Sequence, residues 1–106
     1  MQLISKYLII LILGGNLAAQ TGIVAGQVID RSTGLPLVGA NIMVQDFNLG
    51  SATDLTGRYS MMLKEGTFQI TCSVIGYAPA TLGVNIATTS SSTLNFELEP
   101  VTIESK

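Results

Sequence analysis

The chain reads GQVID at residues 26–30, GLPLVGAN at 34–41, TDLTGRY at 53–59 and IGY at 75–77. Each block contains Gly, Pro, Asn or Asp, residues that favour turns, and most of them run into residues that favour strands. Four spaced blocks of this kind in a chain of 106 residues predict one small, turn-rich β domain. Such a domain leaves little room for an active site.

Between the turns, apolar residues recur at every second position, which is the period of a half-buried strand. The pattern predicts about seven strands, at residues 23–30, 38–46, 51–54, 58–63, 67–75, 80–86 and 93–99. No sustained helical period follows residue 19. The predicted fold is therefore all-β, a seven-stranded antiparallel β-sandwich whose two sheets bury their apolar faces against each other.

Eight residues of the blocks are predicted to have structural roles at turns and strand ends. Glycine supplies backbone angles that other residues avoid, proline fits a loop better than a central strand, and Asp accepts backbone N–H groups. These residues are Gly26, Asp30, Gly34, Pro36, Gly39, Asp54, Gly57 and Gly76. A hairpin turn is also predicted at residues 64–66, between two expected strands.

Three acidic residues, Asp30, Asp46 and Asp54, offer an alternative role as calcium ligands from neighbouring loops. Calcium takes about six to eight oxygen ligands. Alternating acidic positions within one loop are missing from the sequence. Turn shaping is therefore the favoured role for each Asp, and no metal site or cofactor is predicted.

The first 19 residues have the pattern of a secretory signal peptide. Lys6 precedes the apolar run 7–13, and glycines interrupt that run. Small residues at 18–19 suit a cleavage site after Ala19, with cleavage after Gln20 as the alternative. The run is shorter than the roughly 20 residues that cross a bilayer. We expect an exported protein with a signal peptide at 1–19, a sandwich domain at 20–99 and a linker or truncated tail at 100–106. The alternative is an uncleaved anchor or a buried helix.

Charge excludes one class of partner. Without Lys6 the chain has four basic and seven acidic residues, a net charge of −3. A basic patch is the electrostatic signature of nucleic-acid binding, and none is visible. We expect no nucleic-acid partner, and no stable membrane span after signal cleavage.

The residue types in the chain do not indicate a catalytic site. The chain has no histidine, which excludes the Ser-His-Asp and Cys-His arrangements and the common zinc sites. The single cysteine, Cys72, alternates with apolar residues and is predicted to be a small core residue. No catalytic residue is assigned, and the protein is predicted not to be an enzyme.

Two features remain as candidate contact surfaces. Tyr59 shares its face with Met61 and Leu63 and is predicted to lie in the core, whereas Tyr77 is the candidate exposed contact. The edge strands of a small open sandwich also carry unpaired backbone groups that can bind a partner strand. The sequence therefore favours docking to a protein through an edge or a loop end.

The ordered set of four blocks resembles the carboxypeptidase regulatory-like domain, a seven-stranded sandwich of transthyretin-like (prealbumin-like) arrangement. The version with IGY at 75–77 is most similar to the N-terminal extension of TonB-dependent outer-membrane receptors of Bacteroidetes-type bacteria, and residues 98–104 are similar to the linker that leads to the receptor's plug. The resemblance implies a periplasmic or outer-membrane-associated docking module for nutrient uptake. Its partner would be a neighbouring receptor domain or another periplasmic or outer-membrane protein.

Two alternatives stay open at this point. One is a free-standing secreted binding or adhesion module that contacts carbohydrate. The other is an accessory domain of a metallocarboxypeptidase, which would require an adjoining zinc-binding catalytic domain.

Overall fold

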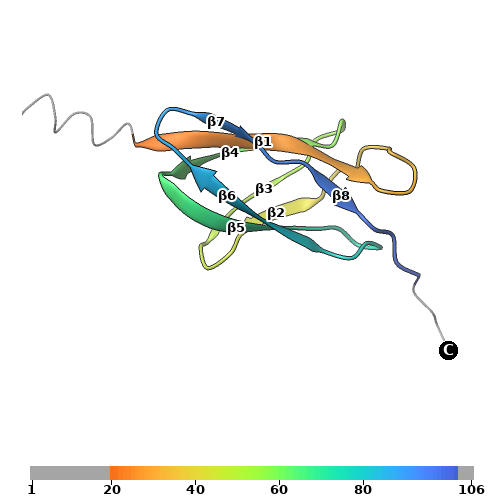
Figure 1. Cartoon of the computed structure of the whole chain (residues 1–106). Coiled ribbons are helices and arrows are strands. Elements are labelled where there is room, and N and C mark those ends of the chain that lie inside the picture. The colour runs from red at the N-terminus through yellow and green to blue at the C-terminus, as the bar shows by residue number, and fades with distance from the viewer. Residues whose placement is uncertain (1–19, 103–106) are drawn as a thin grey trace, which may run out of the picture.

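A computed structural model describes residues 20–102 of the chain (Figure 1), so the expected signal segment 1–19 and the last residues of the tail lie outside the described residues. The described part contains strands and turns and no helix. The eight strands are β1 (Thr21–Asp30), β2 (Asn41–Val44), β3 (Leu49–Ala52), β4 (Arg58–Lys64), β5 (Gly66–Ser73), β6 (Ala80–Ile86), β7 (Ser91–Thr93) and β8 (Phe96–Leu98). They form two sheets packed face to face, which confirms the all-β sandwich.

The first sheet is built around the long strand β1. Strand β4 pairs with one side of β1 in the antiparallel sense, while β7 and then β8 pair with its other side in the parallel sense. A purely antiparallel sandwich is therefore wrong for this sheet. After β6, which belongs to the second sheet, the chain crosses to the first sheet and forms β7 and β8 beside β1. These last two strands therefore run in the same direction as β1.

The strand predicted at residues 93–99 is interrupted, and this raises the count from seven strands to eight. Gly26 lies at the interruption, inside β1, and a side chain there would collide with the carbonyl oxygen of Leu94. The Leu94 N–H donates to the oxygen of Ala25 at 2.9 Å, and the side-chain oxygen of Asn95 accepts the N–H of Gln27 at 2.9 Å. The side-chain oxygen of Asn95 thus takes the place of a backbone acceptor between the two strands, and the absence of a side chain at Gly26 leaves room for this.

The second sheet has the order β3-β2-β5-β6, with antiparallel pairs throughout. The chain changes sheet at residues 64–66, since β4 belongs to the first sheet and β5 to the second. The hairpin predicted there is wrong. Gly66, with a φ of 147°, allows the sharp bend that carries the chain across the sandwich.

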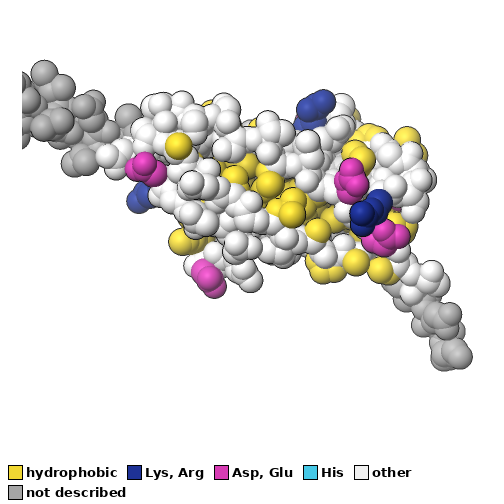
Figure 2. Space-filling model, in the orientation of Figure 1, with side chains coloured by type: hydrophobic (Ala, Val, Ile, Leu, Met, Phe, Trp, Pro, Cys, Tyr) yellow, Lys and Arg dark blue, Asp and Glu magenta, His cyan; other side chains and the backbone are white. Residues whose placement is uncertain are grey.

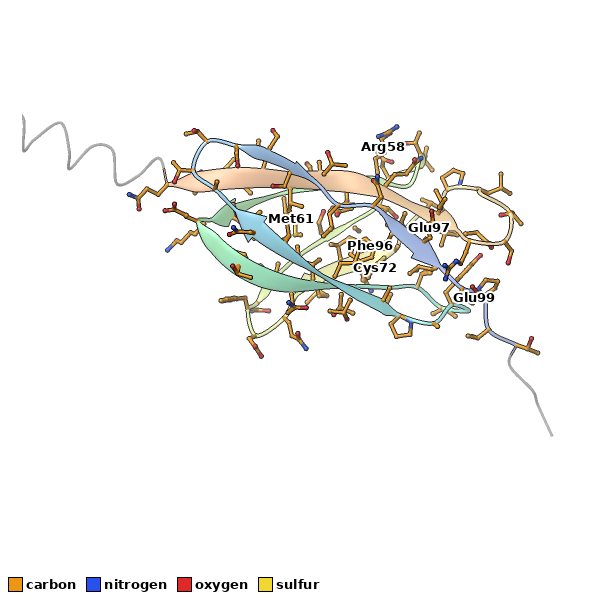
Figure 3. All side chains as sticks on the ribbon, viewed as in Figure 1. Arg58, Met61, Cys72, Phe96, Glu97 and Glu99 are labelled. Atoms are coloured by element: carbon orange, nitrogen blue, oxygen red, sulfur yellow. The ribbon has the colours of Figure 1, made fainter. Side chains whose placement is uncertain are left out.

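The core lies between the two sheets and is formed by the alternate apolar residues of the strands. Figure 3 shows Phe96 and Cys72 in this layer. The ring of Tyr59 packs near that of Phe96, and the Tyr59 hydroxyl donates to the oxygen of Leu94 at 2.5 Å. Each large side chain buried in this way contributes about 1.5–3 kcal/mol. The buried apolar residues are Val24, Val28, Ala40, Ile42, Val44, Tyr59, Leu63, Ile70, Cys72, Ile86, Phe96 and Leu98.

The chain enters the described structure at one end of the sandwich and leaves it at the other (Figure 1). The loop that follows β1 lies at the end where the chain leaves, beyond β8. Among residues 20–102 there is no helix of the length and apolar character that a membrane span requires.

Candidate functional site

The sequence blocks meet at one end of the sandwich, the end where the chain leaves. We call this region the motif end and define it by the loop residues 30–39, 53–57, 75–77 and 99–101. Backbone hydrogen bonds join these loops: the Val28 N–H donates to Gly57, and the Gly39 N–H donates to Thr53. Residues far apart in the sequence therefore form one continuous surface.

Asp30 organises the first loop of the motif end. One oxygen of its carboxylate accepts the N–H groups of Ser32 at 2.6 Å and Thr33 at 3.1 Å. The other oxygen accepts the hydroxyl of Tyr77 at 2.6 Å. These bonds, led by the one from Tyr77, lower the pKa of the Asp30 carboxyl because each donor favours the ionised form. The predicted turn role of Asp30 thus corresponds to three bonds on a nearly buried side chain.

Gly34 closes the loop that Asp30 begins. Its N–H donates to the backbone carbonyl oxygen of Asp30 at 2.7 Å, and its φ of 77° is one that residues with a side chain rarely adopt. Pro36 then forms a single bridge with Ile29 of β1, so it lies beside an edge and not within a central strand.

Asp54 holds the second loop. Its Oδ1 accepts the N–H groups of Thr56 at 2.9 Å and Arg58 at 3.0 Å, and also the Thr56 hydroxyl at 2.8 Å. The bond from the Arg58 N–H is the largest of the causes that lower the pKa of this carboxyl. Gly57 completes the turn with a φ of 76°. A side chain at this position would collide with the oxygen of Val28.

Thr53 is a structural residue to which sequence reasoning assigned no role. It is buried, its hydroxyl donates to the oxygen of Leu37 at 2.6 Å, and that same hydroxyl accepts the N–H of Ala40 at 2.8 Å. It therefore ties the loop at 34–41 to the loop at 53–57. The local signal is a small β-branched hydroxyl residue directly before the turn-forming Asp54.

Tyr77 is half-buried and packs against the core, so it is less exposed than predicted, and its role as a contact residue stays a prediction. Its ring turns inward because its hydroxyl donates to Asp30, and that bond raises the pKa of the phenol. Gly76, with a φ of 94°, reverses the chain just before it. The exposed side chain of this block is instead Ile75, with 95% of its surface accessible.

The departing chain is attached to the same loops. Tyr77 forms an antiparallel bridge with Pro100, the Ala78 N–H donates to Glu99 at 2.9 Å, and the Val101 N–H donates to Gly76 at 3.0 Å. Residues 99–101 therefore leave as an extended segment bound to the Gly76 turn. The path of residues 99–101 is therefore set by the motif end itself.

Exposed apolar side chains lie on the loops of the motif end and on the departing chain, and we call them the apolar rim. Leu55 is 86% accessible and lies at the tip of the Asp54 turn. Arg31 lies beside the rim at 4.0 Å from Glu97 and 3.9 Å from Glu99, in exposed pairs of the kind that add little stability. Figure 2 shows yellow side chains on both sides of this charged group. The rim consists of Leu35, Val38, Leu55, Ile75 and Val101.

The opposite end of the sandwich has a different character. There a cleft of about 610 Å³ opens between the sheets, where the described chain begins. Phe47 and Phe68 meet edge to face at 5.4 Å in its wall, and Met62, 67% accessible, lies at its margin. Sequence reasoning missed this cleft because its residues come from strands and turns far apart in the chain.

The described residues offer no catalytic or metal-binding arrangement. Among residues 20–102 there is no group of three or more Asp, Glu, His or Cys side chains that could hold a metal ion. The three Asp residues weighed as calcium ligands do not form such a group. Cys72 is buried as predicted, and burial raises the pKa of its thiol to about 11, which suppresses the reactive thiolate.

A family model for the CarboxypepD_reg-like domain matches residues 24–106. The chain belongs to this family. It is a regulatory-like domain of a non-catalytic family, and the resemblance drawn from the four blocks is confirmed.

Two kinds of curated protein contain a related segment. The TonB-dependent receptor SusC of Bacteroides thetaiotaomicron is 40% identical over 83 residues, which span 74% of this chain and 8% of the receptor. Human carboxypeptidase D is 36% identical over 75 residues, 71% of this chain and 5% of that protein. The domain therefore corresponds to a small part of each of these relatives.

Solved structures share the fold at low sequence identity. The minor pilin GBS52 of Streptococcus agalactiae aligns with a TM-score of 0.61 at 19% identity, over 82% of this chain and 48% of that one. Catechol 1,2-dioxygenase of Acinetobacter sp. ADP1 aligns with a TM-score of 0.65 at 14% identity, over 79% and 54% of the two chains. At these identities the likeness shows the sandwich fold alone.

Proposed function

We propose that this domain is the periplasmic N-terminal docking module of a TonB-dependent outer-membrane receptor. Its motif end would seat the next domain of the same polypeptide, and the protein would be exported and associated with the outer membrane. The observation that carries the proposal is the exit of the chain. Residues 99–101 leave through the motif end, bonded to the Gly76 turn, and the loops of this end carry the apolar rim.

The chemistry of the rim suits a protein partner. Exposed apolar side chains that gather around a small polar group are typical of protein contact sites. Leu55 and Ile75 extend from turns that Asp54 and Gly76 hold in fixed shapes. A partner would therefore meet a preformed surface and would lose little free energy in ordering it.

Relatives support the receptor context. Besides SusC, the TonB-dependent receptor P39 of Formosa agariphila is 32% identical over 87 residues, which span 79% of this chain and 8% of that receptor. In both receptors the matching segment is a small part of a long chain. A role in nutrient uptake for this domain would follow from membership of such a receptor, with the transport step performed elsewhere.

Cell fractionation tests the proposal directly. An antibody against the sandwich would be used to probe the outer-membrane, periplasmic and medium fractions of the source organism. A band much larger than 11.1 kDa in the outer membrane is the expected result. A soluble band near that mass in the periplasm or the medium would contradict the receptor role.

A second candidate function is that of an accessory domain in a metallocarboxypeptidase, because carboxypeptidase D contains a segment 36% identical to this one. The same antibody distinguishes it, since the large band would then copurify with a zinc-dependent peptidase activity and not with the outer membrane. A free-standing carbohydrate-binding module has less support, because Tyr77, its main aromatic candidate, is half-buried and bonded to Asp30.

A further inference from the structure

The two sheets end in edge strands, and most of these edges are protected against pairing with another strand. Strand β4 carries the charges of Arg58 and Lys64 at its two ends. Strands β7 and β8 have three residues each and are separated by the interruption at Leu94. Strand β3 has four residues and lies against β4, where the Ser51 hydroxyl donates to the oxygen of Ser60 at 3.4 Å. Short length, charge and covering neighbours are the usual protections of an edge.

Strand β6 is neither short nor charged, although β1, β7 and β8 of the other sheet lie across the sandwich from it. Its seven residues, ATLGVNI, include no charged side chain and no proline. Its pairing with β5 runs from Ala80 to Ile86 without a bulge. On its other side it has no paired strand among residues 20–102. An edge of this length and character is a site where another strand can add to the sheet.

Apolar side chains lie along the same edge. Leu82, which faces the inner side of the sheet, is still 38% accessible, and Val84 on the same face is half-buried. Figure 2 shows a strip of yellow side chains across the middle of this view, between β6 and the strands β7 and β8. The sandwich is thus open along β6, and an added strand would cover this strip.

The sequence of β6 is complementary to itself. If two copies meet in antiparallel register about Gly83, Leu82 of one copy lies opposite Val84 of the other, on the apolar face. Thr81 then lies opposite Asn85 on the polar face, where both side chains are exposed. No like charges face each other, and Gly83 brings no side chain to the symmetry axis.

We propose that β6 is a self-association surface, on which a second copy of this chain pairs β6 with β6 in the antiparallel register centred on Gly83. The two four-stranded sheets then form one continuous sheet across the pair. The surface is separate from the motif end, so the proposal does not depend on the receptor role. Because one strand edge buries less than a standard interface of about 1,600 Å², the pair is weak and forms at high local concentration.

Matched charge variants test the register. In the Thr81→Lys, Asn85→Glu variant, each new Lys lies opposite the Glu of the other copy. In the Thr81→Lys, Asn85→Lys variant, Lys lies opposite Lys. Within one chain both positions pair with threonines of β5, Thr71 and Thr67, so the two variants should fold alike, which circular dichroism checks.

Sedimentation velocity over a concentration series of the full 106-residue chain provides the readout. We expect the Lys/Glu variant to dimerise about tenfold more tightly than the wild type, since two opposite-charge pairs contribute up to about 1 kcal/mol each. The Lys/Lys variant should be monomeric. Equal sedimentation of all three proteins would overturn the proposal, and so would capture of β6 by a different protein while the chain itself stays monomeric.

Disulfide trapping gives an independent check. A mixture of Thr81→Cys and Asn85→Cys chains should form a covalent dimer on mild oxidation, because these positions face each other in the proposed register. Either variant alone should not, since its cysteines would be about 13 Å apart, beyond the reach of a disulfide. Cys72 is buried and should not form a cross-link in this experiment. Equal cross-linking of one variant alone would contradict the register.

Discussion

The two ends of the sandwich are held together by different kinds of contact. At the motif end, backbone bonds and the carboxylates of Asp30 and Asp54 fix the turns, and apolar side chains extend outward from them. At the cleft end, Phe47 and Phe68 meet edge to face, and together with Met62 they line a cleft of about 610 Å³. A surface of fixed shape suits a constant partner, whereas a lining of long apolar side chains adapts its shape easily. The recognisable sequence blocks gather at the motif end because fixed turns depend on particular residues such as Asp30 and Asp54.

The largest expected effect is at Gly57. Alanine there would require a left-handed backbone, and its Cβ would lie 2.7 Å from the oxygen of Val28. We expect Gly57→Ala to cost about 3 kcal/mol of unfolding free energy, the sum of backbone strain and collision. Gly34 is the matched control, with a φ of 77° and open space around it, so Gly34→Ala should cost only about 1 kcal/mol. Urea denaturation measures both, and equal losses would mean that the motif end is not tightly packed.

The next effect concerns the bond that joins the first loop to the chain exit. Asp30→Ala leaves the Tyr77 hydroxyl and two backbone N–H groups without their acceptor. We expect the melting temperature to fall by about 5 °C. Tyr77→Phe removes only one of the three bonds and should lower it by less. If Tyr77→Phe had the larger effect, the carboxylate would not be the centre of the loop.

Acid should weaken the motif end selectively. The pKa values of Asp30 and Asp54 are both lowered from an ordinary value of 3.8, so their ionised forms stabilise the fold. That contribution is complete above pH 3.8 and is lost as the pH falls through the lowered folded values. Urea midpoints measured downward from neutral pH should show a steeper acid loss in the wild type than in Asp54→Ala. Parallel curves would exclude Asp54 as a source of the acid sensitivity.

The smallest effect on stability is expected at the cleft end. Met62→Ser changes an exposed side chain and should alter the unfolding free energy by less than about 0.5 kcal/mol. The same change should weaken the fluorescence of an apolar dye such as anilinonaphthalene sulfonate, because Met62 lines the cleft. Leu55→Ser, an exposed change at the motif end, should leave dye fluorescence as it is. If Leu55→Ser lost the dye signal instead, the dye would bind at the motif end, and the assignment of the adaptable apolar site to the cleft end would be contradicted.

What the sequence predicted correctly is local. Strand faces such as Val24 and Val28 follow from the period of two, and the turns at Asp30 and Asp54 follow from acceptors that reach backbone groups two to four residues away. Contacts between distant residues were beyond this reasoning. The Tyr77–Asp30 bond spans 47 positions, and it turned the expected exposed aromatic inward.

The pairing of strands was also beyond local reasoning. The period of two identifies the buried face of a strand and says nothing about which neighbour it joins or in which direction. The change of sheet at residues 64–66 therefore looked like a hairpin, and the parallel entry of β7 and β8 was missed. The cleft depends on the same long-range placement of Phe47, Met62 and Phe68.

The most direct test of the proposed docking role is to ask whether a receptor domain binds this one, and where. The chain, labelled with ¹⁵N, would be titrated with the plug domain of the SusC receptor of Bacteroides thetaiotaomicron, a 40% identical relative over the matched segment. We predict that amide shifts concentrate at the motif end, at Leu55, Ile75 and Tyr77, and leave Met62 unchanged. Shifts confined to the cleft end, or no shifts at any plug concentration, would contradict the assignment of the motif end as the docking surface.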